Sequence, residues 1–393
     1  MTHIGSAAEL TELRDSVRAF LAAKSDEQSV RLVSQTERGY DEALWKQMAD
    51  QLGLPGLALP EEYGGDGFSF AELQVVLEEM GRFLVPSPFL PSVVLAAGAI
   101  LATGDQVAAQ AYQPGIASGK TTAAHAVAES GGLWSFDQLS ASARPVQGDG
   151  PGGTGGGSPP CTGKVGGGWL VTGTKQFVLH GATADLLVVA AHTDSGPSFF
   201  AVQGDALGLT RTALRTLDPT MPMITLVLDE APATLIGAGG GAGPALEAVL
   251  DRAMTALAAE QTGAARACLE ASAAYARERV QFGRPIGSFQ AVKHKCADML
   301  VKVELAQAAA TEAARAASGA PDAPPLPVAA AVAHAVCSES FMFVAMENIQ
   351  VHGGIGFTWE HPAHLYFRRA KATQLMFGGP GVYFEHLLRR SGL

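Results

Sequence analysis

The chain of 393 residues has few cysteines and no clustered ones. The four cysteines lie far apart without a CxxC pair, so the sequence indicates neither a zinc site nor a disulfide framework. They are Cys161, Cys268, Cys296 and Cys337. Thiols in this arrangement are typical of a reducing compartment, and charged residues scattered through positions 9–18 interrupt any secretory signal. We therefore predict a cytoplasmic protein.

Basic clusters and long apolar runs are also missing. The sequence has 27 Lys and Arg against 38 Asp and Glu, a formal net charge of −11, and no basic block forms a phosphate-tracking stripe. Nucleic acid is therefore not expected as a partner. The most apolar stretch, Pro88 to Leu101, is too short to span a membrane and is predicted to be a buried helix, so no membrane insertion is expected. The composition, 47% hydrophobic and 17% charged, is that of a folded protein of two or three domains.

The first third of the chain has the period of amphipathic helices. Apolar residues recur at three- and four-residue spacing in four segments, which are residues 9–21, 45–52, 73–83 and 88–110. A loop rich in glycine and proline, residues 53–67, separates the second segment from the third. We predict a helical N-terminal domain over residues 1–117.

After Gly119 the period changes toward two. Five short segments are rich in β-branched or aromatic residues and are separated by Gly, Asp or Pro, namely residues 122–127, 169–174, 186–191, 198–202 and 224–228. They predict a small middle β domain over residues 118–236. Within it, the Gly/Pro tract of residues 147–168 is predicted to be a flexible loop between strands.

The last third is again helical in pattern. Residues 244–317 are rich in alanine and broken only at residues 282–288, which predicts two long, closely packed helices. A further helix is expected at residues 328–351, so residues 237–393 form a predicted helical C-terminal domain. The order of helices, strands and helices predicts a mainly α protein with a middle β domain. There is no βαβ pattern and no GxGxxG after a strand, so a Rossmann site is not supported.

Three segments carry short motifs with a fixed spacing. The segment Tyr275 to Gln290 contains the pattern R-x-x-F-G at Arg279, Phe282 and Gly283. The segment Gln350 to Phe357 has the pattern Q-x-x-G-G-x-G-[YF], and Gly173-Thr-Lys forms a third motif. In order and spacing these motifs resemble signatures of the acyl-CoA dehydrogenase family over nearly the whole chain. The resemblance implies a helical N-domain, a β-barrel-like middle domain and a C-terminal four-helix bundle.

The resemblance also implies a cofactor and a reaction. In family members a carboxylate removes a proton from Cα of an acyl-CoA and N5 of FAD accepts a hydride from Cβ, and electron-transfer flavoprotein is the implied electron acceptor. Arg279 can offer a guanidinium fork to a pyrophosphate, while Gln290 can bond the adenosine end and Phe282 lies in the same motif.

The second signature implies that the flavin is shared between subunits. In the family, Gln350, Gly353 and Gly354 approach the dinucleotide of a neighbouring subunit, because glycine has no Cβ to block the approach. The chain is therefore expected to form a homo- or hetero-tetramer in which assembly is part of cofactor binding.

The catalytic base of the family is missing from both of its usual positions. Phe377 occupies one of them and Ala253 the other. Glu260 lies seven residues after Ala253, about two turns along the same helix, and is our candidate for a displaced catalytic base. The alternative is a structural glutamate that pairs with an arginine of a neighbouring helix, since a lone buried carboxylate is costly.

The contacts that a family member makes with its own flavin are also depleted. The loop that reads T/S-E-P-x-x-G-S-D in the family is Ala128 to Leu133 here and keeps Glu129. Phe177 stands where the family has Trp, and Leu179 replaces the flavin-facing hydroxyl. Glu129 and Phe177 remain candidate cofactor contacts.

This asymmetry allows two functions. The favoured function is FAD-dependent α,β-dehydrogenation of an acyl-CoA, either by a homo-oligomer or by a heteromer of the kind found in steroid or side-chain degradation. The alternative is a non-catalytic structural partner that completes the flavin site of a sister subunit. A weaker alternative is a hydroxylating or nitroalkane-oxidising relative of the same fold. Three histidines fall within 13 residues, but no carboxylate or cysteine completes a metal spacing, so no metal site is predicted. They are His352, His361 and His364.

Overall fold

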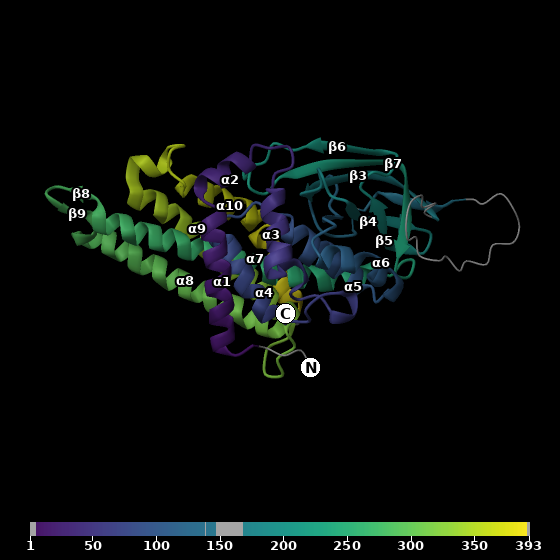
Figure 1. Cartoon of the computed structure of the whole chain (residues 1–393), viewed down its shortest axis with the longest axis horizontal. Helices are drawn as coiled ribbons and strands as arrows, with labels where there is room; N and C mark the ends of the chain where they lie inside the picture. The colour runs from purple at the N-terminus through teal and green to yellow at the C-terminus, as the bar shows by residue number, and fades with distance from the viewer. Residues whose placement is uncertain (1–4, 138, 147–167, 391–393) are drawn as a thin grey trace, which may run out of the picture.

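The computed structural model describes residues 5–137, 139–146 and 168–390. Helices make up the first and the last part of the chain, and the strands of a β sheet lie between them in sequence. The molecule is elongated (Figure 1). The mainly α architecture with a middle β domain is therefore confirmed. The predicted flexible tract at 147–168 lies, except for Gly168, outside the described residues.

The N-terminal part is a set of helices, with capping residues that fix where several of them begin. Ser6 and Glu9 form a capping box at the start of α1, and Ser69 and Glu72 form another at the start of α4. The helices are α1 (Ala7–Lys24), α2 (Glu27–Val33), α3 (Glu42–Leu52), η1 (Leu54–Gly56), η2 (Glu61–Tyr63), α4 (Phe70–Arg82), the π-helix η3 (Leu90–Ala96), α5 (Ala97–Ala102) and α6 (Gln106–Ala117).

The prediction of one helix over residues 88–110 is wrong. The helical path stops at Thr103, Gly104 has a φ of 70°, and a new helix begins after Asp105. The Asp105 carboxylate accepts hydrogen bonds from the backbone N–H groups of Val107 and Ala108, which caps α6.

The middle part closes on itself. Strands β4, β2, β3, β7 and β5 pair in that order, and β5 pairs again with β4, so the five strands form a barrel-like ring. β1 joins β4 in parallel and β6 joins β7. The strands are β1 (Ala123–Ala126), β2 (Ser142–Pro145), β3 (Trp169–Leu179), β4 (Leu186–Thr193), β5 (Gly196–Gln203), β6 (Leu209–Ala213) and β7 (Met223–Ile236). The sequence pattern did not predict the short strands β2 and β6.

The C-terminal part is a bundle built on three long helices. α7, α8 and α9 pack against one another, and α10 packs on α9. The elements are α7 (Ala242–Glu278), β8 (Val280–Gln281), β9 (Arg284–Pro285), η4 (Ile286–Ser288), α8 (Gln290–Ala317), α9 (Leu326–His352), η5 (Gly353–Phe357), α10 (Ala363–Leu375) and α11 (Pro380–Arg390). The predicted bundle is confirmed.

The three parts share one core. A single cluster of buried apolar residues runs from Val17 through the β strands to Phe377. α6 ends at Ala117 and β7 ends at Ile236, where the predicted boundaries fall. Because the core continues across both points, the division into three domains stays a prediction.

The segment from Leu326 to Phe357 is long and apolar enough to cross a membrane by length and composition. However, 67% of its apolar window is buried inside the fold, as in the core helix of a globular protein. This segment, not Pro88 to Leu101, is therefore the stretch that satisfies a membrane-span criterion among the described residues.

The N-terminal helices are joined to the bundle at a close crossing of α4 and α7. A Cβ added at Gly81 would lie 2.0 Å from the carbonyl oxygen of Glu260, and one added at Gly263 would lie 1.8 Å from the carbonyl oxygen of Glu78. Two glycines therefore let the backbones of the two helices touch.

We expect Gly263→Ala to lower the free energy of unfolding by about 1 to 3 kcal/mol, because the added methyl group forces the two helices apart. This loss opposes the roughly 1 kcal/mol that alanine contributes in an open helix. The matched control is Gly243→Ala, also in α7, where a Cβ would meet nothing within 4 Å. Urea unfolding of both variants checks this, and equal stability of the two would contradict the crossing.

Candidate functional site

The tip of the α7–α8 hairpin carries the first group of candidate residues. It projects from the body of the molecule at the labels β8 and β9 (Figure 1). Arg279, Phe282 and Gln290 are all exposed there, and 90% of Phe282 is accessible to solvent. Among the described residues, the Arg279 guanidinium has no hydrogen-bond or ion-pair partner. The tip therefore presents a free cation and an aromatic ring to another molecule.

The second group lies where α9 ends. Gln350 is exposed on the last turn, and the chain then turns through Gly353, which has a φ of 63°. A Cβ added at Gly353 or at Gly354 would meet nothing within 4 Å, so this backbone is open to solvent. The geometry allows a ligand to approach the backbone closely, as the family signature implies.

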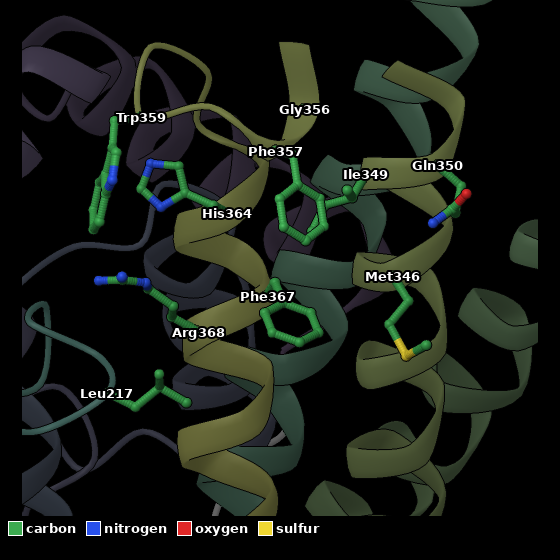
Figure 2. A pocket seen from close by; sticks show the side chains of 10 residues that line it. All are labelled: Leu217, Met346, Ile349, Gln350, Gly356, Phe357, Trp359, His364, Phe367 and Arg368. Atoms are coloured by element: carbon green, nitrogen blue, oxygen red, sulfur yellow. The ribbon is translucent and has the colours of Figure 1, made fainter. Parts of the chain in front are cut away.

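A cavity of about 500 Å³ adjoins this turn. Figure 2 shows its lining side chains, which come from α9, η5, the turn between η5 and α10, α10 and the loop before β7. They are Leu217, Met346, Ile349, Gln350, Gly356, Phe357, Trp359, His364, Phe367 and Arg368. The cavity is thus mainly apolar and aromatic, with Gln350 at one side and a cation at the other.

The cation of the cavity is held against an aromatic ring. The Arg368 guanidinium lies 4.3 Å from the centre of the Trp359 ring, and His364 meets the same ring edge-on at 4.7 Å (Figure 2). A ring nitrogen of His364 lies 3.3 Å from Arg31 of α2. Burial, together with the charges of Arg31 and Arg368, lowers the pKa of His364. A flat ring system with acceptor atoms fits such a mixture of planar apolar faces and fixed donors.

Glu129 is in a different environment, because its carboxylate is already bonded inside the fold. Oε1 lies 2.7 Å from Nζ of Lys175 and accepts from the Ala141 N–H, while Oε2 accepts from the Ser140 backbone N–H and hydroxyl. Burial lowers the pKa of Lys175 to about 8, although the Glu129 carboxylate opposes this shift. The pair ties β3 to the segment after β1. A role of Glu129 in binding a cofactor stays a prediction.

Aromatic side chains pack together beside the loop that contains Glu129. Trp134, just beyond the loop that contains Glu129, packs edge-on against Phe377 with ring centres 5.0 Å apart. His125 also packs edge-on against Trp134, with ring centres 5.6 Å apart. Phe377 has a φ of 63° and is only 7% exposed. The residue at the position of the missing base is therefore part of the core.

Of the two candidate cofactor contacts in the middle part of the chain, Glu129 and Phe177, only Phe177 faces solvent. It lies in β3 with a φ of 55°, and 44% of the side chain is exposed. A left-handed backbone is strained for an aromatic residue and persists only where the surroundings enforce it.

Glu260 is buried in α7 and has a cationic neighbour. Nη1 of Arg369, on α10, lies 3.6 Å from Oε2 of Glu260. The same guanidinium donates from Nε to Asp218 at 2.6 Å and from Nη2 to Thr220, both in the loop before β7. The structure thus gives Glu260 the arginine of a neighbouring helix that the structural alternative requires.

The acidity of Glu260 is nevertheless perturbed. Burial raises its pKa to about 7; Arg369 lowers it and the nearby Asp218 raises it further. A carboxyl group with this pKa has the acidity expected of a general base at neutral pH, but the same shift arises in a buried ion-pair network.

The sequence pattern missed Arg369, Asp218 and Trp134. Arg369 is separated from Glu260 by more than 100 residues, and no periodic signal joins them.

The three clustered histidines do not converge on one point. The ring centres of His352 and His361 lie 4.2 Å apart, while the His364 ring packs against Trp359. Among the described residues, no group of three or more His, Cys, Asp or Glu side chains is arranged to hold a metal ion.

These features define a class of protein with a helical, barrel and helical order, in which the candidate residues at the hairpin tip and at the end of α9 are exposed. Family models for the N-terminal and C-terminal domains of acyl-CoA dehydrogenases match residues 7–120 and 239–391. The chain belongs to the acyl-CoA dehydrogenase family, whose members are flavoprotein oxidoreductases that act on CH–CH groups.

Several relatives cover nearly the whole chain. Acyl-CoA dehydrogenase IpdE2 of Mycolicibacterium smegmatis is 33% identical over 375 residues, 95% of this chain and 96% of the relative. The ChsE4–ChsE5 complex of Mycobacterium tuberculosis contains a chain of similar structure, with a TM-score of 0.82, 30% identity and coverage of 100% and 99%. A variant of the Tcur3481–Tcur3483 steroid ACAD gives a TM-score of 0.81, 34% identity and 98% coverage of both chains.

The Glu260 site predicts a dependence of stability on pH. The pKa of Glu260 is about 7 in the folded protein and 4.5 ordinarily. Between pH 4.5 and 7, Glu260 therefore keeps a proton in the folded protein that it releases in the unfolded chain. The stability contributed by this group is full below pH 4.5 and is lost as the pH rises through 7. Between these limits, the free energy of unfolding should fall by up to about 3 kcal/mol more than in Glu260→Gln.

Urea unfolding at a series of pH values measures this difference. The control is Glu339→Gln, which changes an exposed glutamate of α9 and should leave the pH profile unchanged. A constant offset between the wild-type protein and Glu260→Gln across the window would contradict the perturbed acidity.

Proposed function

We propose that this chain is a subunit of a heteromeric, FAD-dependent acyl-CoA dehydrogenase. It lends its exposed hairpin tip and its α9 turn to a flavin seated mainly in a sister subunit, which supplies the catalytic base. FAD, when bound, accepts the hydride that leaves Cβ of the acyl group. The residues of this chain that would contact FAD are Arg279, Phe282, Gln290, Gln350, Gly353 and Gly354.

The contact between Trp134 and Phe377 carries the proposal. It joins the two segments at which a family member would hold its own flavin and its base. The rings leave no carboxylate at the base position, and the neighbouring Glu129 is bonded to Lys175. This chain therefore has no carboxylate at position 377 to act as the base beside a flavin of its own.

The exposed groups fit the complementary role. A pyrophosphate needs cationic donors, and Arg279 is a cation without an internal partner in the described part of the chain. An adenine ring needs planar faces and a hydrogen-bonding side chain, which the cavity beside Gln350 offers. These groups point outward, so the flavin they serve belongs to an interface. Similar structures from two-component complexes support a hetero-oligomer, for which we propose a tetramer.

The remaining partners follow from this role. The substrate is an acyl-CoA, and a steroid-derived acyl group is the first candidate, since one similar structure is a steroid ACAD. The electrons pass to electron-transfer flavoprotein in the cytoplasm. Under this proposal the chain supplies no catalytic base, but the complex needs its side chains to bind the cofactor.

A second candidate function keeps catalysis in this chain. It rests on Glu260, whose raised pKa suits proton removal at neutral pH. Under our proposal, Glu260→Gln in the assembled complex leaves turnover of an acyl-CoA within about twofold, because the pair with Arg369 is structural. A loss of about a hundredfold or more, the usual contribution of a general base, would move the base to this chain.

The flavin contact itself is tested by Arg279→Ala in the complex co-expressed with its sister subunit. We expect FAD to be held about 1 to 3 kcal/mol more weakly, the usual loss for a charged hydrogen bond. Arg277→Ala, which removes an exposed arginine of the same hairpin, is the matched control and should retain flavin. FAD content is read from absorbance after gel filtration. Equal flavin content in both variants would show that Arg279 has been misassigned.

A further inference from the structure

A second cavity, of about 330 Å³, lies where the N-terminal helices meet the first third of α7. Its walls come from the loop at residues 58–60, α4, the η3–α5 segment and α7. Every lining residue except Arg252 is apolar or glycine, including Leu59, Phe70, Leu101 and Val249. The volume falls within the range of small-ligand sites.

Arg252 is the one charge at this cavity. It lies four residues after Ala248 and three after Val249, so all three side chains occupy one face of α7 and line the cavity together. The side chain keeps contact with solvent. Among the described residues, it has no hydrogen-bond or ion-pair partner. Desolvation by the surrounding walls lowers its pKa, and no neighbouring carboxylate contributes to the shift.

We propose that this cavity binds a small apolar carboxylic acid, with its carboxylate on the Arg252 guanidinium and its hydrocarbon body against the cavity walls. A guanidinium offers two parallel N–H donors that match the two oxygens of a carboxylate. The apolar walls cover the hydrocarbon body and exclude ligands that are polar along their whole length, while Arg252 itself is exposed to solvent.

A phosphate-bearing ligand fits less well. Phosphate sites usually combine several donors, often with a helix N-terminus. α7 begins at Ala242, ten residues before Arg252, so its N-terminus is about 15 Å away along the axis. Among the residues that line the cavity, Arg252 is the only cation.

The site is distinct from the proposed flavin contacts. Arg279 is 27 residues further along the chain, a separation of about 40 Å on a straight helix. Binding at Arg252 can therefore be measured whether or not the flavin assignment holds.

The test uses octanoate and its neutral counterpart 1-octanol, titrated by calorimetry into the purified assembled protein. We expect octanoate to bind about tenfold or more tightly than 1-octanol, because only the carboxylate completes the charged hydrogen bonds. Arg252→Met should remove this preference while leaving 1-octanol binding unchanged. Arg252→Lys keeps the charge but not the fork and should give an intermediate preference.

A second variant keeps the cation and fills the cavity. Gly98 lines the cavity, and a Cβ there would first meet Val249 at 3.9 Å, so Gly98→Leu should fold and block both ligands. Equal affinity for octanoate and 1-octanol in the wild-type protein would overturn the proposal. So would octanoate binding that survives both Arg252→Met and Gly98→Leu.

Discussion

The arrangement of the whole chain depends on the contact between the backbones of α4 and α7. Gly81 and Gly263 remove the side chains that would hold the helices apart, so each helix touches a carbonyl oxygen of the other. α4 is buried along most of its length, and its acidic residues Glu78 and Glu79 are neutralised by Arg14 and Arg18 of α1. α7 can therefore run from the N-terminal helices to the outer hairpin as one element of 37 residues.

This long helix separates three chemical environments. Its first third borders an apolar cavity at Arg252, its middle carries the buried Glu260 beside Arg369, and its end presents Arg279 to solvent. Charges at the middle are satisfied within the chain, whereas the cations at the two ends have no partner among the described residues. Unpaired donors at a surface are the groups that gain most from an external anion, because the ligand supplies the missing hydrogen bonds.

Much of the architecture could be predicted from the sequence, because it depends on local periodicity. The 3.6-residue pattern predicts most of the helices, and the change of period predicts the middle sheet. Strands β2 and β6 were missed since they are short and largely exposed, which leaves little alternation to detect. The break before Asp105 was missed because one capping side chain decides it.

The site divides in the same way. The residues of each signature, 275–290 and 350–357, are close together in the sequence, so they could be predicted as candidate residues from the sequence alone. The structure adds which of them are exposed. The partner of Glu260 comes from α10, and the contact between Trp134 and Phe377 joins residues that are distant in sequence. Only the packed fold brings such groups together.

The central claim is that the flavin belongs to an interface and not to this chain's own cleft. A density map of the assembled complex with its sister subunit tests it most directly. The account predicts isoalloxazine density in the sister subunit, with the adenosine and pyrophosphate against the hairpin tip of this chain, and Trp134 still packed on Phe377. Isoalloxazine density between Trp134 and Phe377, with the two rings displaced, would contradict it.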